Sequence, residues 1–268
     1  MFNEIKNFVS DIIKKRETIK TLTIRNIKAR HAGSYLGVFW IYFQPLLFMI
    51  VLCFVFSIGL KGGESKGDVP FVIVLTVGFT AWYYFADCFG SSPKTISRHS
   101  YLVKKVNFRL SVLTIVNLLE NIVSHIVLVF FVLRLSVYYG FMPSWYWLQI
   151  LYYFFAMFVL LIGLSWIVSS TNLFVKDVSN LVAITVQFGF WLTPIFWNID
   201  RIPVKFIWIV KLNPMFYIIE GYRDCLIYKV AFWQKPYLTL YFWCVALSVC
   251  LLGALVFRRL RPHFAEVI

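Results

Sequence analysis

Four ionisable side chains stand in or beside long apolar runs, where a charge is most costly. Glu120, His125 and Arg134 share the run 110–139, and Asp87 lies near the end of an earlier run. A charged residue at the centre of a bilayer costs about 3 kcal/mol on insertion scales, so such groups must face protein or water. They predict a polar substrate path or, as the alternative, buried pairs or side-chain ends that reach the interface, as Arg134 and Asp87 could do. A proton relay is less favoured, because it would need more acidic groups at mid-membrane.

Motifs for catalysis are absent from the sequence. It contains no GxxxxGK[ST] phosphate loop, no HExxH motif and no nucleophile elbow, and its cysteines form no CxxC pair or Cys/His group with metal-ligand spacing. A lipid-modifying transferase would show paired acids or a His/Asp set in its loops, and none stands out. We therefore expect no catalytic residue, metal or cofactor in this chain. If ATP is used, another chain must hydrolyse it.

Composition indicates the kind of fold that positions these groups. Hydrophobic residues make up 60% of the 268 residues and charged residues 14%, against roughly 45–50% and 25% in soluble domains. Apolar runs recur along the whole chain, which predicts a single all-α membrane domain over 1–268 with six transmembrane helices. The expected helices are 36–60, 70–90, 110–139, 145–174, 178–197 and 237–257.

Two further segments are apolar but unsuited to crossing a bilayer. Residues 1–34 combine apolar residues near a helical period with many basic ones, which predicts an amphipathic interface helix on an anionic lipid surface. Its alternative is a solvated helix that packs on a partner. Residues 198–230 contain two short apolar pieces, which favour a re-entrant hairpin or, alternatively, two interfacial helices.

The basic residues indicate orientation rather than nucleic-acid binding. The formal net charge is +14, but Lys and Arg stand in short clusters between apolar runs. The segments expected on one side, 1–34, 91–110, 172–180 and 258–268, hold 17 of them, and those on the other side, 61–69 and 198–236, hold 8. The positive-inside rule then places both termini in the cytoplasm. A short helix in the basic loop, over 93–106, could dock into a soluble partner and pass its motion to the membrane. An ordinary basic inner loop is the alternative.

Aromatic residues make up 20% of the chain, more than interfacial belts alone require. The cluster 145–147 is typical of a belt. Trp191, Phe196 and Trp197 flank Pro194, and we expect these rings to line a path for sugars, whose polarised C–H groups stack on aromatic faces.

A series of motifs occurs in order along most of the chain. They are Arg25–Arg30 followed by GSYLGVFW (33–40) and QPLL (44–47), then LVKKVNF (102–108), KDV (176–178), LTPI (192–195), NPM (213–215) and EGYR (220–223). In this set the chain resembles the polysaccharide exporter permeases of the ABC-2 type, which export O-antigen, capsule and teichoic acid.

That resemblance implies a homodimer in the bacterial inner membrane, with two copies of a separate ABC ATPase that bind ATP and Mg²⁺. The implied substrate is an undecaprenyl-diphosphate-linked glycan, with O-antigen favoured over capsule and teichoic acid. A drug or small-lipid exporter of the same superfamily is a less favoured alternative.

The resemblance also implies roles for particular residues. The coupling helix that meets the ATPase would include Pro93, Arg98, Tyr101, Lys104 and Lys105. The gate on the outer side, 198–230, would involve Pro194, Asn213, Pro214, Glu220 and Arg223. On charge and position, the substrate would contact Arg25, Lys28 and Arg30, and on the apolar-run and aromatic patterns described above it would contact Glu120, Trp191, Phe196 and Trp197. The three basic groups among these suit a diphosphate, because Arg and Lys are strong phosphate donors.

Overall fold

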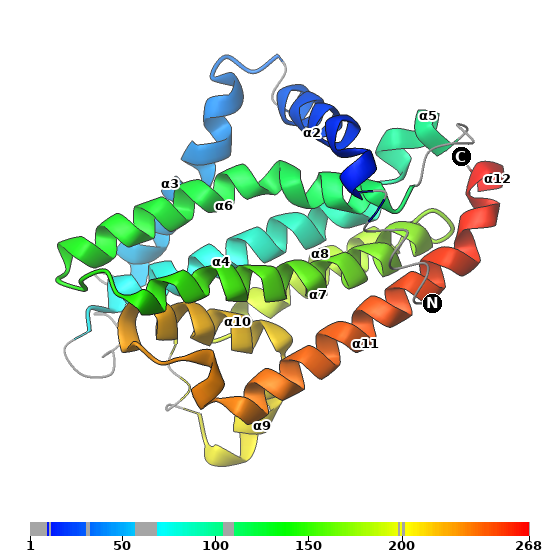
Figure 1. The fold of residues 1–268 in the computed structure, drawn as a ribbon. Coiled ribbons are helices and arrows are strands. Elements are labelled where there is room, and N and C mark those ends of the chain that lie inside the picture. Colours follow the sequence, from blue (N-terminus) through cyan, green and yellow to red (C-terminus); the bar gives the residue numbers. More distant parts are fainter. Residues whose placement is uncertain are drawn as a thin grey trace.

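The computed structural model describes residues 10, 12–30, 33–56, 69–103, 110–197, 199 and 202–267. Within those ranges the chain is almost entirely helical and contains no strand. Helices α4, α6, α7 and α8 lie side by side as a bundle, and α11 crosses them at a slant while it packs on α7 (Figure 1). The prediction of an all-helical fold is confirmed.

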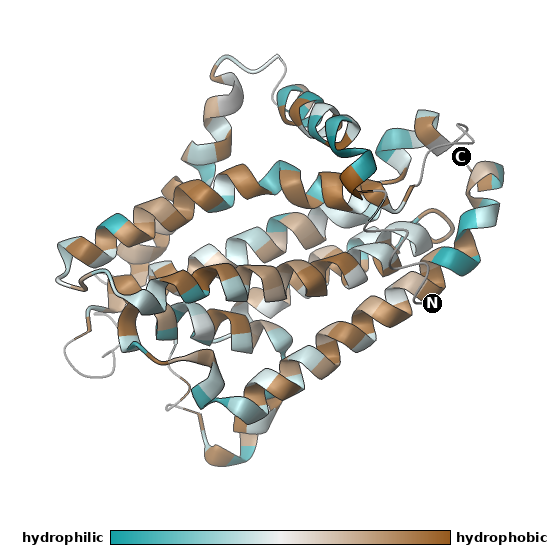
Figure 2. Ribbon diagram, viewed as in Figure 1, coloured by the Kyte–Doolittle hydropathy of each residue, from teal (hydrophilic) through white to brown (hydrophobic). Residues whose placement is uncertain are grey.

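Four helical stretches are long and apolar enough to cross a membrane, judged by length and composition. They are Phe71–Lys94, Val112–Tyr138, Trp145–Thr171 and Pro236–Val267. Their central helices are α4 (Phe71–Ser91), α6 (Val112–Tyr138), α7 (Gln149–Thr171) and α11 (Pro236–Leu260). Figure 2 shows hydrophobic residues over most of α6, α7 and α11.

Two other apolar helices are shorter than a typical bilayer span. These helices, α3 (Trp40–Phe54) and α8 (Val178–Leu192), have 15 residues each, or about 22 Å at the usual rise per residue. Residues 57–60 of the first predicted span lie outside the described part of the chain. The six-span topology and the cytoplasmic position of both termini therefore stay predictions.

Helix α8 ends before the predicted boundary at residue 197. Thr193 has extended backbone angles, φ −89° and ψ 138°, as expected for a residue before proline. Because Pro194 has no backbone N–H, it cannot continue the hydrogen-bond ladder of the helix. The segment 193–197 therefore forms an irregular turn at the end of α8.

The predicted re-entrant region contains two short helices, α9 (Val204–Leu212) and α10 (Pro214–Arg223). Between them the Asn213 side chain caps α10 and accepts a hydrogen bond from Met215 N at 3.0 Å. A π-helical turn, Asp224–Tyr228, follows α10. Whether this pair dips into the membrane stays a prediction.

The only described long helix of strongly polar composition is α2 (Arg16–Arg30), which packs on α6 (Figures 1 and 2). Its buried residues are Ile19, Leu22 and Thr23, and most other positions are exposed. The predicted interface helix thus has a described part at 16–30, while residues 1–9, 11, 31 and 32 lie outside the description.

The described part of the segment predicted as one coupling helix over 93–106, residues 93–103, is a chain of short turns. It contains 3-10 turns at Ser92–Lys94 and Ser97–His99, followed by α5 (Ser100–Val103). Pro93, Ile96, His99 and Leu102 are buried. This spacing of three residues matches the period of a 3-10 helix. Lys94, Arg98 and Tyr101 are exposed, and Lys104 and Lys105 lie outside the described residues.

Buried hydrophobic side chains form two clusters. The larger one joins α4, α6, α7 and α10 and includes Leu75, Leu118, Met157 and Ile218. The smaller one joins α2, the segment 92–103, the start of α6 and helix α12 (Phe264–Val267). Because the second cluster ties α2 to the short turns, both are held against the same end of the bundle.

Candidate functional site

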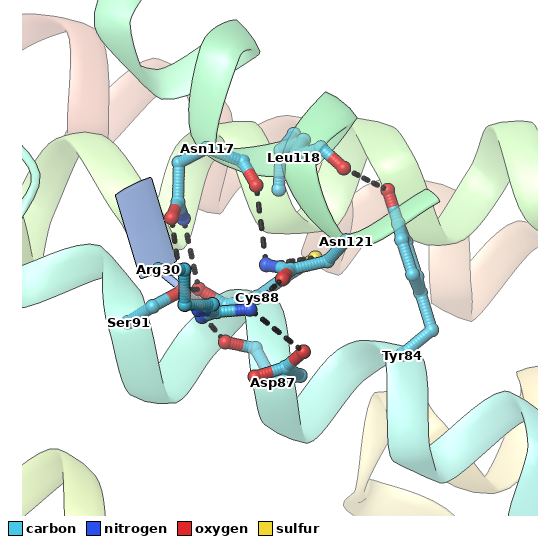
Figure 3. Close-up of polar contacts among 8 residues, drawn as sticks. All are labelled: Arg30, Tyr84, Asp87, Cys88, Ser91, Asn117, Leu118 and Asn121. Atoms are coloured by element: carbon cyan, nitrogen blue, oxygen red, sulfur yellow. Dashed lines mark hydrogen bonds and ion pairs between the residues drawn. The ribbon is translucent and has the colours of Figure 1, made fainter. Parts of the chain in front are cut away.

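A polar cluster lies where the end of α2 meets α4 and α6 (Figure 3). Arg30 Nη1 donates to Asn121 Oδ1 at 2.9 Å. The same nitrogen lies 3.6 Å from Asp87 Oδ2, and the two side chains are 36% and 28% exposed. The Arg30 guanidinium therefore contacts both α4 and α6, at a position that is partly exposed to solvent.

A buried polar layer continues from that cluster into the bundle (Figure 3). Asn117 Oδ1 accepts from Ser91 Oγ at 2.9 Å, and its Nδ2 donates to the Cys88 carbonyl at 3.1 Å. Ser92 Oγ and Ser165 Oγ are 2.6 Å apart, which extends the layer to α7. Paired donors and acceptors lower the cost of placing these groups away from water.

Asn26 makes a second junction, four residues before Arg30 on α2. Its Nδ2 donates to Glu120 Oε1 at 2.5 Å and lies 3.0 Å from His99 Nε2. His99 Nδ1 is 2.9 Å from the Thr95 carbonyl. The amide of Asn26 thus contacts both α6 and the turns at 92–103.

The ionisable residues of the apolar runs have different surroundings. Asp87 and Glu120 have partners on α2, as the alternative of buried pairs predicts. His125 is buried, with Nε2 3.1 Å from the Tyr222 hydroxyl and the Phe154 ring stacked at 5.1 Å. Arg134 is exposed. A substrate contact at Glu120 stays a prediction.

The three basic residues predicted to bind diphosphate all lie on α2. Arg25 Nη1 is 3.4 Å from the Tyr101 hydroxyl, and its guanidinium carbon is 5.7 Å from that ring centre. Lys28 is exposed. Arg30 is held by Asp87 and Asn121, as described above. The structure brings these residues to one helix, and their role towards a diphosphate stays a prediction.

A second polar cluster surrounds Arg223 of α10, beside the first half of α4. Its Nη1 donates to Glu220 Oε1 at 2.7 Å, its Nη2 to the Ile195 carbonyl at 2.8 Å and its Nε to the Val74 carbonyl at 3.3 Å. The Arg223 side chain is 5% exposed. The side chain therefore joins α10, α4 and the irregular turn after α8.

The other residues predicted at the outer gate lie close to this second cluster. Asn213 Nδ2 donates to Thr193 Oγ1 at 2.8 Å, which connects the start of α10 to the end of α8. Pro194 is buried in the turn, and Pro214 occupies the first turn of α10. The structure thus brings these residues together, and their action as a gate stays a prediction.

The three aromatic residues predicted to line a sugar path also meet in the structure. Trp191 and Phe196 make an edge contact at 5.0 Å, and Phe196 stacks on Phe56 at 4.9 Å. Trp197 Nε1 donates to the Trp191 carbonyl at 3.0 Å. Trp191 remains 55% exposed, so one ring of the group is accessible.

Sequence reasoning missed the neutral polar residues around Arg30 and at the Asn26 junction. Asn117 and Asn121 stand four residues apart on α6, and such a spacing places both on one helix face. Amides in an apolar run are a recognisable signal for hydrogen bonds between helices. Asn26 gave no such signal, because it lies in a polar segment. The pair of Lys235 and Asp224, which closes the turn after α10, was also missed.

Two further features bear on what the site could hold. Among the described residues no group of three or more His, Cys, Asp or Glu side chains could hold a metal ion. A cavity of about 510 Å³ lies beside the short turns, and Lys94, Ser97, Asn172, Lys176 and Ser179 are among its lining residues.

Apolar helices of spanning length, joined by polar clusters at their junctions, define a multi-pass membrane protein. The chain belongs to the ABC-2 type transporter family, whose sequence profile matches residues 17–227. That match runs from α2 to the π-helical turn after α10 and confirms the resemblance seen in the motifs.

Three relatives are similar over nearly their whole lengths. One is an O-antigen export system permease protein RfbA of Klebsiella pneumoniae, 27% identical over 262 residues, which cover 94% of this chain and 95% of that protein. A second RfbA of the same organism is 25% identical over 262 residues, which again cover 94% of this chain and 95% of that protein. The RfbA of Myxococcus xanthus is 25% identical over 264 residues, 97% of this chain and 98% of that protein.

Proposed function

We propose that this chain is the transmembrane subunit of an ATP-driven exporter that moves undecaprenyl-diphosphate-linked O-antigen across the bacterial inner membrane. The observation that supports this most is the nearly full-length similarity to three O-antigen export permeases from two organisms. The chain acts as a homodimer with two copies of a soluble ABC ATPase, and the ATPase binds ATP and Mg²⁺. No catalytic step belongs to this chain.

The exposed side of the turns at 92–103 suits the ATPase contact. Lys94, Arg98 and Tyr101 are exposed there, whereas Pro93 is buried and its carbonyl accepts from Asn172 Nδ2 at 3.0 Å. The turns are thus fixed to the α7–α8 connection on one side and open to a partner on the other. Lys104 and Lys105 extend the basic character of this contact in the sequence.

The exposed basic face of α2 suits the diphosphate of the substrate. Arg25 and Lys28 are exposed, and Arg30 is one-third exposed while it contacts Asp87. Phosphate oxygens accept charge-assisted hydrogen bonds from such groups, and each bond is about twice as strong as a neutral one. The sugars follow the aromatic group at Trp191, and the segment around Arg223 forms the outer gate.

The test begins in the organism from which the chain comes. Deletion of its coding region should leave lipid-linked glycan on the cytoplasmic side of the inner membrane, and re-expression should restore the glycan to the cell surface. Chemical analysis of the accumulated glycan distinguishes O-antigen from capsule and teichoic acid. Normal surface glycan in the deletion strain would contradict the proposal.

A second measurement uses the purified complex. The chain should copurify with an ABC ATPase, and the undecaprenyl-diphosphate-linked glycan extracted from the deletion strain should stimulate hydrolysis in proteoliposomes. Gln in place of Arg25, Lys28 and Arg30 together should abolish that stimulation, and Lys28→Gln alone, at an exposed position, should weaken it without loss of assembly. Stimulation by small lipids or drugs, and not by the glycan, would instead favour the drug or small-lipid exporter.

A further inference from the structure

The side-chain nitrogen of Asn26 contacts two elements that are far from α2 in the sequence. It lies 2.5 Å from Glu120 Oε1 on α6 and 3.0 Å from His99 Nε2 in the turns at 92–103. Neighbouring contacts on α2 involve other groups: Arg25 meets Tyr101, and Arg30 meets Asn121. The hydrogen bonds of Asn26 to both elements thus share a single atom.

The chemistry of the three groups makes this arrangement self-consistent. The Thr95 carbonyl can only accept, so His99 Nδ1, 2.9 Å away, carries the hydrogen. In a neutral imidazole the other nitrogen, Nε2, is then an acceptor. A side-chain amide nitrogen has two hydrogens, one for His99 Nε2 and one for the Glu120 carboxylate. Each donor therefore meets an acceptor.

The hydrogen bonds of Asn26 lie between the turns at 92–103 and the membrane helix α6. The turns that contain His99 present Lys94, Arg98 and Tyr101 outward, on the side proposed above for the ATPase. Glu120 lies on α6, which packs on α4 and continues into the bundle. We infer that Asn26 is a positioning residue that holds these turns to α6, so that a displacement imposed at 92–103 moves the membrane helices. This inference rests on the proposed function.

An isosteric substitution tests the bridge. Asn26→Asp keeps the size of the side chain but replaces the donor nitrogen with an acceptor oxygen, which faces the Glu120 carboxylate. In proteoliposomes that contain the chain and its ATPase, the glycan molecules moved per ATP hydrolysed should fall at least fivefold. Assembly of the complex and its hydrolysis rate without glycan should stay within twofold of the unsubstituted protein.

A matched control separates the bridge from the change in charge. Lys20→Gln alters the charge of α2 by the same amount at an exposed position, and it should leave the transport-to-hydrolysis ratio within 1.5-fold of the unsubstituted protein. A purely structural role for Asn26 would lower assembly and hydrolysis with transport, so the ratio would not move.

A second background identifies the partner of Asn26. With Glu120→Gln in place, the amide of the new side chain can donate to the carboxylate introduced at position 26, which restores a bond between α2 and α6, whereas His99 Nε2 still lacks its donor. The factor by which Asn26→Asp lowers the ratio should therefore be at least twofold smaller in this background, without returning to one. Because each factor is measured within its own background, an effect of Glu120→Gln alone does not alter the comparison.

The outcomes are distinct. An unchanged ratio in Asn26→Asp, a ratio that falls equally in both Glu120 backgrounds, or a loss of transport in proportion to hydrolysis would each overturn the role of Asn26 and leave the proposed function intact. Failure of the unsubstituted complex to move glycan would overturn the proposed function itself, and the role of Asn26 with it.

Discussion

Arg223 is an almost fully enclosed cation, and its removal should destabilise the protein strongly. The side chain is 5% exposed and donates to two backbone carbonyls and to Glu220. In Arg223→Met the carbonyls of Val74 and Ile195 lose their charged donor, and the Glu220 carboxylate loses its counter-ion. Removal of one partner of a buried pair costs about 3–5 kcal/mol, and because Glu220 is 24% exposed we expect the lower end of that range.

Unfolding of the purified chain in mixed detergent and SDS micelles, followed by tryptophan fluorescence, measures this loss. Arg223→Met with Glu220→Gln should recover part of the stability, because no uncompensated charge is left in the cluster. Arg134→Met is the matched control at an exposed position, with an expected change within about 0.5 kcal/mol. A loss below about 1 kcal/mol for Arg223→Met would refute the reasoning that this side chain braces α10 against α4.

Three further results are expected. Gly163→Val should lower the free energy of unfolding by about 1–3 kcal/mol in the same assay, because a Cβ at Gly163 would lie 2.6 Å from backbone atoms of α11. Gly90→Ala should not lower it, because a Cβ at Gly90 meets open space. Tyr222→Phe should cost about 1 kcal/mol by removing the hydrogen bond to buried His125, and an unchanged unfolding midpoint would show that the contact contributes nothing. Lys28→Gln should raise the glycan concentration for half-maximal ATPase stimulation at unchanged stability, and an unchanged concentration would exclude Lys28 as a diphosphate ligand.

The sequence predicts the long helices well, because their apolar runs are continuous. The predicted span 70–90 corresponds to α4 at Phe71–Ser91, and 110–139 to α6 at Val112–Tyr138. Local chemistry also marks the start of α10, where Asn213 caps the helix and Pro214 occupies its first turn. The end of α8 was placed too late because hydrophobicity continues past Thr193, whereas the backbone cannot remain helical before Pro194.

Contacts between distant segments could not be predicted in the same way. The hydrogen bond from Asn26 to Glu120 joins residues 94 positions apart, and the one from Arg223 to the Val74 carbonyl joins residues 149 positions apart. The apolar run around Glu120 shows that this acid needs a partner, but it does not show which of many polar residues provides it. The fold decides this by laying α2 across α6.

Helix α4 connects the two polar clusters, and its burial and lack of a proline decide how a displacement passes from one cluster to the other. The cluster at Arg30 contacts it at Asp87, and the cluster at Arg223 contacts it at Val74, a separation of about 20 Å along the helix axis. In the most apolar stretch of the span that contains α4, 67% of the residues are buried, against 50% or less in the spans that contain α6, α7 and α11. Helix α4 also contains no proline. Because α4 is so enclosed and lacks a proline, one of the usual causes of a helix kink, we expect it to move as a rigid rod. We therefore expect a displacement of α2 relative to α10 to be taken up at one of the two clusters. The ion pair of Arg30 with Asp87 should yield first, because both side chains are partly solvated.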